Sequence, residues 1–454
     1  MIQQGKKVSE AASISTKKNE FSWLRQDIPS LPDEPFVGNL INYQERVDGY
    51  LYSSEYVNPD KLEESEMVYA NWNQLANRWL DLEDVTPYFN LAPEEIKDYP
   101  VFQIDSLTKL NQAKALYDFA SQEIELLSSS WLEPIYPLDK LLIEKKGNSF
   151  DKNMLLLHLL RKQGINANLV MVNDKYIGRK RLIEVPFINQ FGSSVISAEI
   201  EGKNYLLDAS DSIVPFGLLP LEKLVDQGFV LERGKGRLEK LHHQFRSGSI
   251  QTVKLDKNDS LGFVLKNQIR LTDHEAIKIG KAIRSFNGEG SIFENVSRFK
   301  NLDLNEINID NQLKEKRAVT LSFDSKIEDS NGELVFIYPF QFSEFFKNPF
   351  TQESRLLPVE FQFPFFENLN STISIPLGYE LEDYPESISI TIPSKSVKFS
   401  YLVNLAENEL KIATKLDVTS EYFSVSEYPD LKYIFEELAN HLNTPVVLKK
   451  ITKP

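Results

Sequence analysis

The spacing of apolar residues predicts three helices in the first part of the chain. Residues 65–82 and 106–127 carry apolar side chains at the period of an amphipathic helix, and Ser106 is a suitable N-cap for the second. The segment 150–163 is apolar around most of its circumference and is followed by Gly164, a common helix terminator. We therefore expect this third helix to be buried on nearly all sides.

Strand patterns follow the third helix directly. Residues 165–172 (INANLVMV) read as a strand, and 193–200 and 203–211 are two further β-like runs separated by Glu201-Gly202. A two-residue connection that ends in glycine is typical of a tight hairpin. The expected order is therefore helix, strand, hairpin.

Beyond Gly248 the hydrophobic pattern changes to a period of mostly two, which indicates a β-rich region. One helix interrupts it, for which Thr272 and Glu275 suggest a capping box and Asn287-Gly288 a stop. The chain closes with a helix at 428–442, whose apolar stripe we place at Tyr433, Ile434, Phe435, Leu438 and Leu442, and then a strand.

Composition limits the classes of function. The chain has 454 residues, which favours about two to four domains, and its net charge of −15 repels phosphate backbones and so argues against a nucleic-acid partner. It contains no cysteine, which excludes disulfides, thiolate metal sites and a thiol nucleophile. The sequence offers no cofactor motif and no metal-ligand spacing, so we expect neither a cofactor nor a metal.

The N-terminal residues are polar, and no apolar run has the length of a membrane-spanning helix. We therefore expect a chain with no membrane-spanning segment and no signal peptide in the sequence as it stands. A chain that begins after a removed signal peptide would look the same.

The segment GNSFDKNMLLLHLLRKQGINANLVMV, followed by GKNYLLDASD, resembles the core of the transglutaminase-like superfamily. The resemblance implies a papain-like α/β fold in which a cysteine at a helix start is activated by a histidine on a neighbouring strand, which an aspartate on the next strand orients. On this sequence the family glycine is Gly147, and the cysteine position falls at Ser149. The histidine position falls near Gly192 or Ser193, and the aspartate is Asp208.

Only the aspartate of that triad is retained, so the resemblance implies a degenerate, non-catalytic member. Ser149 as a nucleophile would need a base, and the strand that should supply one contains no histidine. We prefer the interpretation that Ser149 caps the helix that begins at Phe150. Asp208 and Asp211 are interpreted as turn residues that accept backbone N–H bonds, rather than as a cation site or an acid–base pair.

The remaining histidines and acidic motifs also have structural interpretations. His158 lies on the apolar circumference of a helix, and the neighbours His242 and His243 lack the carboxylates at helical spacing that a metal site would use. The segment DKNDSLG at 256–262 lacks the glycine and the distant glutamate of a calcium loop, so we predict a turn there.

Flanking segments extend the resemblance over nearly the whole chain. SWLRQDIPSLPDEPFVGNLINY resembles the end of a β domain of unknown function that precedes degenerate transglutaminase-like domains in bacterial envelope proteins. NPFTQESRLLPVEF, ISIPLGYELEDYPESISI and SEYPDLKYIFEELANHLNTPVVLKK resemble the β domain that closes them. The resemblance implies a location in the periplasm or cell envelope.

These observations predict an α+β fold with a papain/transglutaminase-like α/β core, a mostly β, sandwich-like C-terminal domain and a partial β domain at the N-terminus. The expected parts are the end of an N-terminal β domain (1–60), a helical linker (61–105), the transglutaminase-like domain (106–245) and the C-terminal β domain with its closing helix (246–454).

Two functions remain open at this point. The first is an inactive binding or scaffolding component of the cell envelope, with an unknown protein, peptide or glycan partner. The second is a transglutaminase- or protease-type enzyme that acts on peptide amides with a non-standard site.

Overall fold

The structure is a computed structural model. It describes residues 3–10, 17–24, 26–28, 30–45, 47, 53–56, 64–67, 71–83, 85–90, 103–128, 132–177, 182–243, 245–258, 262–286, 307–327 and 332–451. The chain divides into two compact units, residues 1–34 and 35–454. The helix stop predicted at Asn287-Gly288 lies outside the described residues.

The first unit contains one antiparallel pair of strands. β1 (Gln3–Glu10) pairs with β2 (Lys17–Leu24) so that Gln3 lies opposite Leu24. In the second unit, β3 (Ser53–Tyr56) and β4 (Glu64–Met67) form another antiparallel pair. β1, β2 and β3 therefore lie in the region predicted to be the end of a β domain (1–60), whereas β4 lies in the region predicted to be a helical linker (61–105).

The helix predicted at 65–82 is shorter than expected. Residues 64–67 form β4, and helix α1 (Trp72–Leu80) begins only after Asn71, whose side chain accepts a hydrogen bond from the Gln74 amide. The prediction was wrong for the first residues because Met67 happens to continue the helical spacing of the apolar side chains. A short helix, α2 (Thr86–Asn90), follows α1.

Three helices build the middle of the second unit. α3 (Lys109–Gln122) begins after Thr108, whose hydroxyl accepts from the Asn111 amide, so the cap predicted at Ser106 was wrong by two residues. α4 (Leu138–Glu144) and α3 both contact α5 (Ser149–Lys162). All residues of α5 from Ser149 to Leu160 are buried, which confirms the prediction of a helix enclosed on nearly all sides.

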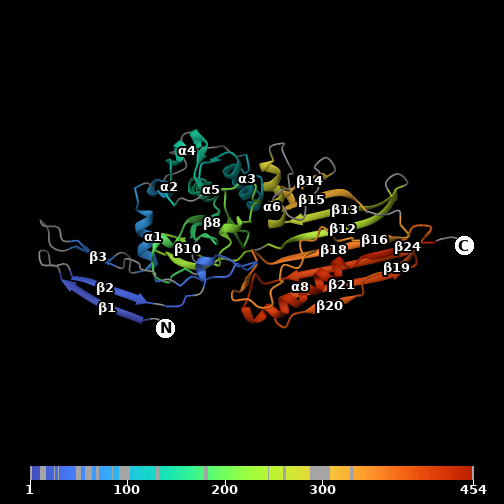
Figure 1. The fold of residues 1–454 in the computed structure, drawn as a ribbon. Coiled ribbons are helices and arrows are strands. Elements are labelled where there is room, and N and C mark those ends of the chain that lie inside the picture. Colours follow the sequence, from blue (N-terminus) through green and yellow to red (C-terminus); the bar gives the residue numbers. More distant parts are fainter. Residues whose placement is uncertain are drawn as a thin grey trace. The chain divides into compact units, whose positions relative to one another are not determined.

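Helix α5 packs on a five-stranded antiparallel sheet, against β7 and β8 (Figure 1). The strand order is β11-β10-β7-β8-β9. The strands are β7 (Asn166–Val172), β8 (Ser193–Ile200), β9 (Lys203–Leu207), β10 (Gln227–Leu231) and β11 (Arg237–Lys240). Glu201 and Gly202 join β8 to β9 with φ angles of 51° and 76°, which confirms the predicted hairpin.

The C-terminal part contains an eight-stranded sheet in the order β14-β15-β13-β12-β18-β22-β21-β20, whose long strands run side by side in Figure 1. Within the described residues of this sheet, β12–β18 is the one parallel pair, and the other pairs are antiparallel. The strands are β12 (Ser247–Asn258), β13 (Gly262–Thr272), β14 (Asn308–Gln312), β15 (Ala318–Lys326), β18 (Phe365–Ser374), β20 (Ile388–Thr391), β21 (Val397–Ala406) and β22 (Glu409–Val418).

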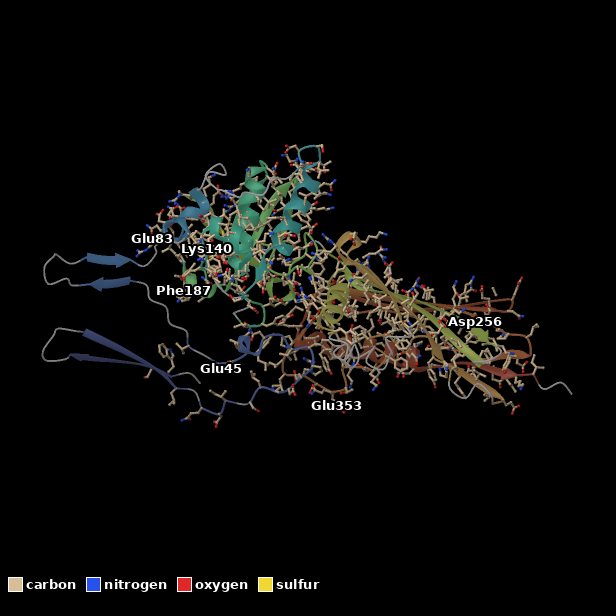
Figure 2. All side chains as sticks on the ribbon, turned by 90° about the horizontal axis from the view of Figure 1, so that it is seen from above. Glu45, Glu83, Lys140, Phe187, Asp256 and Glu353 are labelled. Atoms are coloured by element: carbon tan, nitrogen blue, oxygen red, sulfur yellow. The ribbon has the colours of Figure 1, made fainter. Side chains whose placement is uncertain are left out.

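Of the segment predicted as a turn at 256–262, residues 256–258 belong to β12 and Gly262 to β13, and Asn258 lies opposite Gly262 in the antiparallel ladder, so the prediction was wrong for these residues. Residues 259–261 are outside the described residues. Asp256, near the end of β12 (Figure 2), forms an exposed ion pair with Lys266 at 2.6 Å. Its carboxylate is therefore engaged by a neighbouring strand.

The interrupting helix, α6 (His274–Ser285), does not start with the predicted capping box. Thr272 is still part of β13, and its hydroxyl donates to the carbonyls of Arg246 and Gly248 at 3.3 Å. Glu275 instead forms an ion pair with Lys278. The sequence therefore has the spacing of a capping box, but the side chains do not form its hydrogen bonds.

The closing helix, α8 (Tyr428–Asn443), packs on β21 and ends before strand β24 (Val446–Lys450). β24 is the central strand of a small sheet, between β16 (Leu334–Ile337) and β19 (Tyr379–Asp383). A two-stranded sheet joins β17 (Val359–Glu360) to β23 (Tyr422–Phe423). Tyr433 is 54% exposed, so it was wrongly included in the apolar stripe of α8. The buried side chains are Tyr428, Leu431, Ile434, Phe435, Leu438, Ala439 and Leu442.

The fold is α+β, and one hydrophobic cluster contains residues from both its middle and its C-terminal part. This cluster contains Val170 of β7, Leu219 and Phe363, which joins the middle of the unit to its C-terminal part. The boundaries predicted at residues 60, 105 and 245 stay predictions. In the described parts, no helix combines the length and the apolar character needed to cross a bilayer.

Candidate functional site

Helix α5 begins at the position that the resemblance assigns to the nucleophile. Asn148 is its N-cap: the Asn148 side chain accepts from the Asp151 amide at 2.8 Å, and the Asp151 carboxylate accepts from the Asn148 amide at 2.9 Å. The prediction that Ser149 caps the helix is therefore wrong, since Ser149 is the first helical residue. Its side chain is buried, and its amide donates to the carbonyl of Ser128.

Close packing around Gly147 leaves no room for a side chain. A Cβ at this position would lie 2.7 Å from Leu141 Cδ1 and 2.8 Å from Asp151 Cβ, closer than atoms can approach. The Asp151 carboxylate is held further by the Ile135 amide and by the hydroxyl of Tyr88. The start of α5 is thus fixed by a buried polar cluster around Asp151.

Asp208 follows β9 and is completely buried. Its Oδ1 accepts from Asn153 Nδ2 at 2.9 Å and from the Ser210 amide at 3.1 Å. Its Oδ2 accepts from the Ser210 hydroxyl at 2.8 Å and forms an ion pair of 2.7 Å with Lys223, whose side chain is only 5% exposed. Both oxygens of this carboxylate are therefore engaged by protein groups, none of which is a histidine.

Asn153 connects Asp208 to helix α5 and strand β8. Besides its bond to Asp208, Asn153 Nδ2 donates to the carbonyl of Ser194, and Asn153 Oδ1 accepts from the Ala209 amide. Lys223 Nζ also reaches the Ser194 carbonyl, at 3.3 Å. Ser149 precedes Asn153 by four residues, so the two lie on the same face of α5.

The histidine position of the family falls on the edge of this cluster. Gly192 donates its amide to the carbonyl of Val172, and Ser193 begins β8 opposite Val172. Ser193 and Ser194 are both buried. The structure thus brings β8, the end of β9 and α5 together, and it does so through Asn153 and Lys223, which the sequence reasoning missed.

Two buried groups near the cluster have displaced pKa values. Burial raises the pKa of Tyr117, and the charge of Asp208 adds to the effect; the Tyr117 hydroxyl lies 3.0 Å from the Asp208 carbonyl and 2.9 Å from that of Val214. Burial lowers the pKa of Lys152 to about 8, although its ammonium donates to the carbonyls of Ser121 and Ile124. Nothing in the sequence around Lys152 indicated that its ammonium group would be buried.

The turn interpretation of Asp208 and Asp211 is confirmed, since they accept from the amides of Ser210 and Ile213. Asp211 also pairs with Lys281 and Arg284, which the sequence did not predict. His158 is buried, as expected for a core histidine. His242 and His243 follow β11 in an irregular segment, and the ring of His243 binds the carbonyl of Val225.

Among the described residues, no group of three His, Asp or Glu side chains is arranged to hold a metal ion. Two cavities are described, and neither is lined by Ser149, Gly192, Ser193 or Asp208. The larger, of about 370 Å³, lies elsewhere in the second unit, between residues 36–42, 224–226 and 360–367.

Comparisons with known proteins agree with a fold of this kind. Residues 333–448 match a family described as a Domain of Unknown Function with a solved structure (DUF3858). The chain is also similar to the crystal structure of a putative protease from Parabacteroides distasonis ATCC 8503, with a TM-score of 0.52 and 12% identity over 99% of this chain and 70% of that chain. A comparison with curated proteins gave no match. At this identity the likeness concerns the fold.

Proposed function

We propose that this protein is a degenerate, non-catalytic member of the transglutaminase-like superfamily that acts as a binding or scaffolding component of the cell envelope. The observation that carries the proposal is that both carboxylate oxygens of Asp208 are already bound by other protein groups. In a working triad the aspartate accepts a hydrogen bond from the histidine and orients it. Here Asn153, Ser210 and Lys223 take up both carboxylate oxygens in a fully buried position.

The nucleophile position supports the same proposal. The chain has no cysteine, and Ser149 is buried at the start of α5 rather than at the wall of either described cavity. A serine hydroxyl is a weak nucleophile unless a neighbouring base takes its proton. The cell-envelope location rests on the sequence resemblance alone.

One observation favours the alternative, a transglutaminase- or protease-type enzyme. Lys223 Nζ lies 3.3 Å from the backbone carbonyl of Ser194, and serine–lysine pairs can run acyl transfer, but the Ser194 hydroxyl has no hydrogen-bond partner among the described residues. In this structure, however, Lys223 is engaged by Asp208, and a lysine that serves as a base must be neutral. The ion pair therefore opposes this role.

An assay for amide hydrolysis and for acyl transfer from glutamine-containing peptides separates the two functions. We expect no rate above a heat-denatured control in the wild type, and no change in Ser149→Ala or Ser194→Ala. A turnover rate that falls on either substitution while the thermal transition is kept would overturn the non-catalytic proposal.

A further inference from the structure

The larger cavity of the second unit has the size of a ligand site. Its volume of about 370 Å³ lies within the range of about 300–1,000 Å³ that is usual for small-molecule and side-chain pockets. Its walls come from segments far apart in the sequence: residues 36–42, the loops around 175–176 and 224–226, the start of α6, and residues 360–367. The segment at 36–42 is anchored there, because the Phe36 carbonyl accepts from the Glu360 amide.

Aromatic rings form much of this wall. The ring faces carry partial negative charge and attract cations. The chain already uses two of them in this way: Lys278 Nζ lies 5.4 Å from the centre of the Phe363 ring, and the guanidinium carbon of Arg246 lies 4.8 Å from that of Phe366. The aromatic residues of the wall include Phe36, Tyr176, Phe345, Phe361, Phe363 and Phe366.

The charges of the wall favour a cation over an anion. Both lysines are offset by carboxylates, Lys175 by Glu421 at 2.9 Å and Lys278 by Glu275 at 2.8 Å. Of the four other carboxylates of the wall, Glu360 accepts from the Tyr43 hydroxyl and Glu367 from the hydroxyls of Ser249 and Ser343, whereas Asp226 and Glu344 are exposed. An anionic ligand would have to displace two ion pairs, whereas a cation meets an excess of negative charge and aromatic faces. The acidic residues are Asp226, Glu275, Glu344, Glu360, Glu367 and Glu421.

We propose that this cavity binds an organic cation, namely an alkylammonium or guanidinium group on a short aliphatic chain, as in a lysine or arginine side chain. The aliphatic stem would lie against the rings and the charged head beside the carboxylates. This inference deepens the proposed binding function by naming its ligand class. Cation binding is measured without any activity assay. A failure to bind cations would therefore not show that the protein is an enzyme, and catalytic activity would not exclude cation binding.

The test is titration calorimetry of the full chain with four matched probes: the amides of Nα-acetyl-lysine, Nα-acetyl-arginine, Nα-acetyl-norleucine and Nα-acetyl-glutamate. We expect saturable binding of both cations, about tenfold or more tighter than the uncharged norleucine probe. Free 1,5-diaminopentane and a tri-lysine peptide distinguish a small amine from a peptide source. Equal binding of norleucine, preference for the glutamate probe or no binding of any cation would overturn the proposal.

Three variants locate the binding. Glu344→Gln and Asp226→Asn each remove one negative charge from an exposed position of the wall, and together they should weaken cation binding about tenfold. Glu353→Gln makes the same change at an exposed residue that does not line the cavity, so it should leave the affinity unchanged. An unchanged affinity in the double variant, with an unchanged melting temperature, would place the cation elsewhere and refute the assignment.

Discussion

The ion pair between Asp208 and Lys223 holds two charges away from water. Taking both charges out of water costs free energy, which the pair recovers only because Asn153 and Ser210 complete the hydrogen bonding of the carboxylate. The pair therefore contributes mainly by avoiding an unpaired buried charge. We therefore expect substitutions of these two side chains to have non-additive effects on stability.

Lys223→Met should lower the free energy of unfolding by about 3–5 kcal/mol, because it leaves the Asp208 carboxylate buried without its cation. The double variant Asp208→Asn/Lys223→Met should lose less than the sum of the two single variants. Urea denaturation of the wild type and the three variants measures this coupling. Additive losses would show that the two charges do not stabilise each other.

His274 is a second buried group whose charge matters. Its ring bridges the Ser247 hydroxyl and the Leu219 carbonyl and contacts the rings of Phe245 and Phe363. Burial lowers the pKa of His274 to about 4, below the value of about 6.5 expected in the unfolded chain. The unfolded state therefore takes up a proton first as the pH falls, and stability is lost between about pH 6.5 and 4.

We expect His274 to remove up to about 3 kcal/mol of stability across that window. His274→Gln should flatten this part of the pH profile of the free energy of unfolding relative to the wild type. His242→Gln, at an exposed histidine, serves as the matched control for the loss of an imidazole. If all three profiles have the same slope, the charge of His274 does not control the pH dependence.

At the scale of the element, the start of α5 depends on Asn148 rather than on Ser149. Asn148→Ala removes the capping bond to the Asp151 amide and the bond from Asn148 Nδ2 to the Glu133 carbonyl. Loss of an N-cap costs about 1–2 kcal/mol, and Ser149→Ala should cost less. Thermal denaturation of the two variants decides between them, and a larger loss for Ser149→Ala would restore the sequence-based cap.

The sequence predicted elements better than it predicted their ends and their partners. The α5 helix and the Glu201-Gly202 hairpin have strong local signals, namely an apolar circumference and a turn that requires positive φ. The caps at Ser106, Ser149 and Thr272 failed because several polar residues near each helix start satisfy the same motif. Which one caps depends on where the backbone turns.

The candidate site was predictable only in part, for a related reason. The resemblance pointed to Ser149 and Asp208, which stay predicted site positions, but the partners of Asp208 come from positions that no local pattern marks. Asn153 is one polar residue in an apolar helix, and Lys223 ends a short 3-10 helix (Leu221–Lys223) well after β9. Their contacts arise from the packing of α5 against the sheet, which sequence spacing alone does not give.

At the scale of the whole second unit, the C-terminal helix and strand are part of the fold. α8 contributes six buried side chains to the core that it shares with the eight-stranded sheet, and β24 is the central strand between β16 and β19. Deleting the residues after Glu427 should therefore expose this core and leave two strands unpaired. We expect the truncated chain to aggregate or to lose its cooperative melting transition.

Size-exclusion chromatography and calorimetry of the truncated chain measure this outcome. Tyr433→Ser is the matched control, because Tyr433 belongs to the same helix but is largely exposed, and its substitution should change stability little. A soluble truncation with a cooperative transition would mean that α8 is not integral to the fold. The helix would then be available as an amphipathic element for a partner.

The central claim is that the position which the sequence resemblance assigns to a nucleophile has a structural role, and labelling with a serine-reactive fluorophosphonate tests it without knowledge of a substrate. Peptide mass spectrometry locates any adduct. We predict no stoichiometric labelling of Ser149, Ser193 or Ser194 in the native protein, and the same result in the folded Lys223→Met variant. Stoichiometric labelling of one of these serines in the wild type, lost in Lys223→Met, would contradict the claim and identify an active nucleophile.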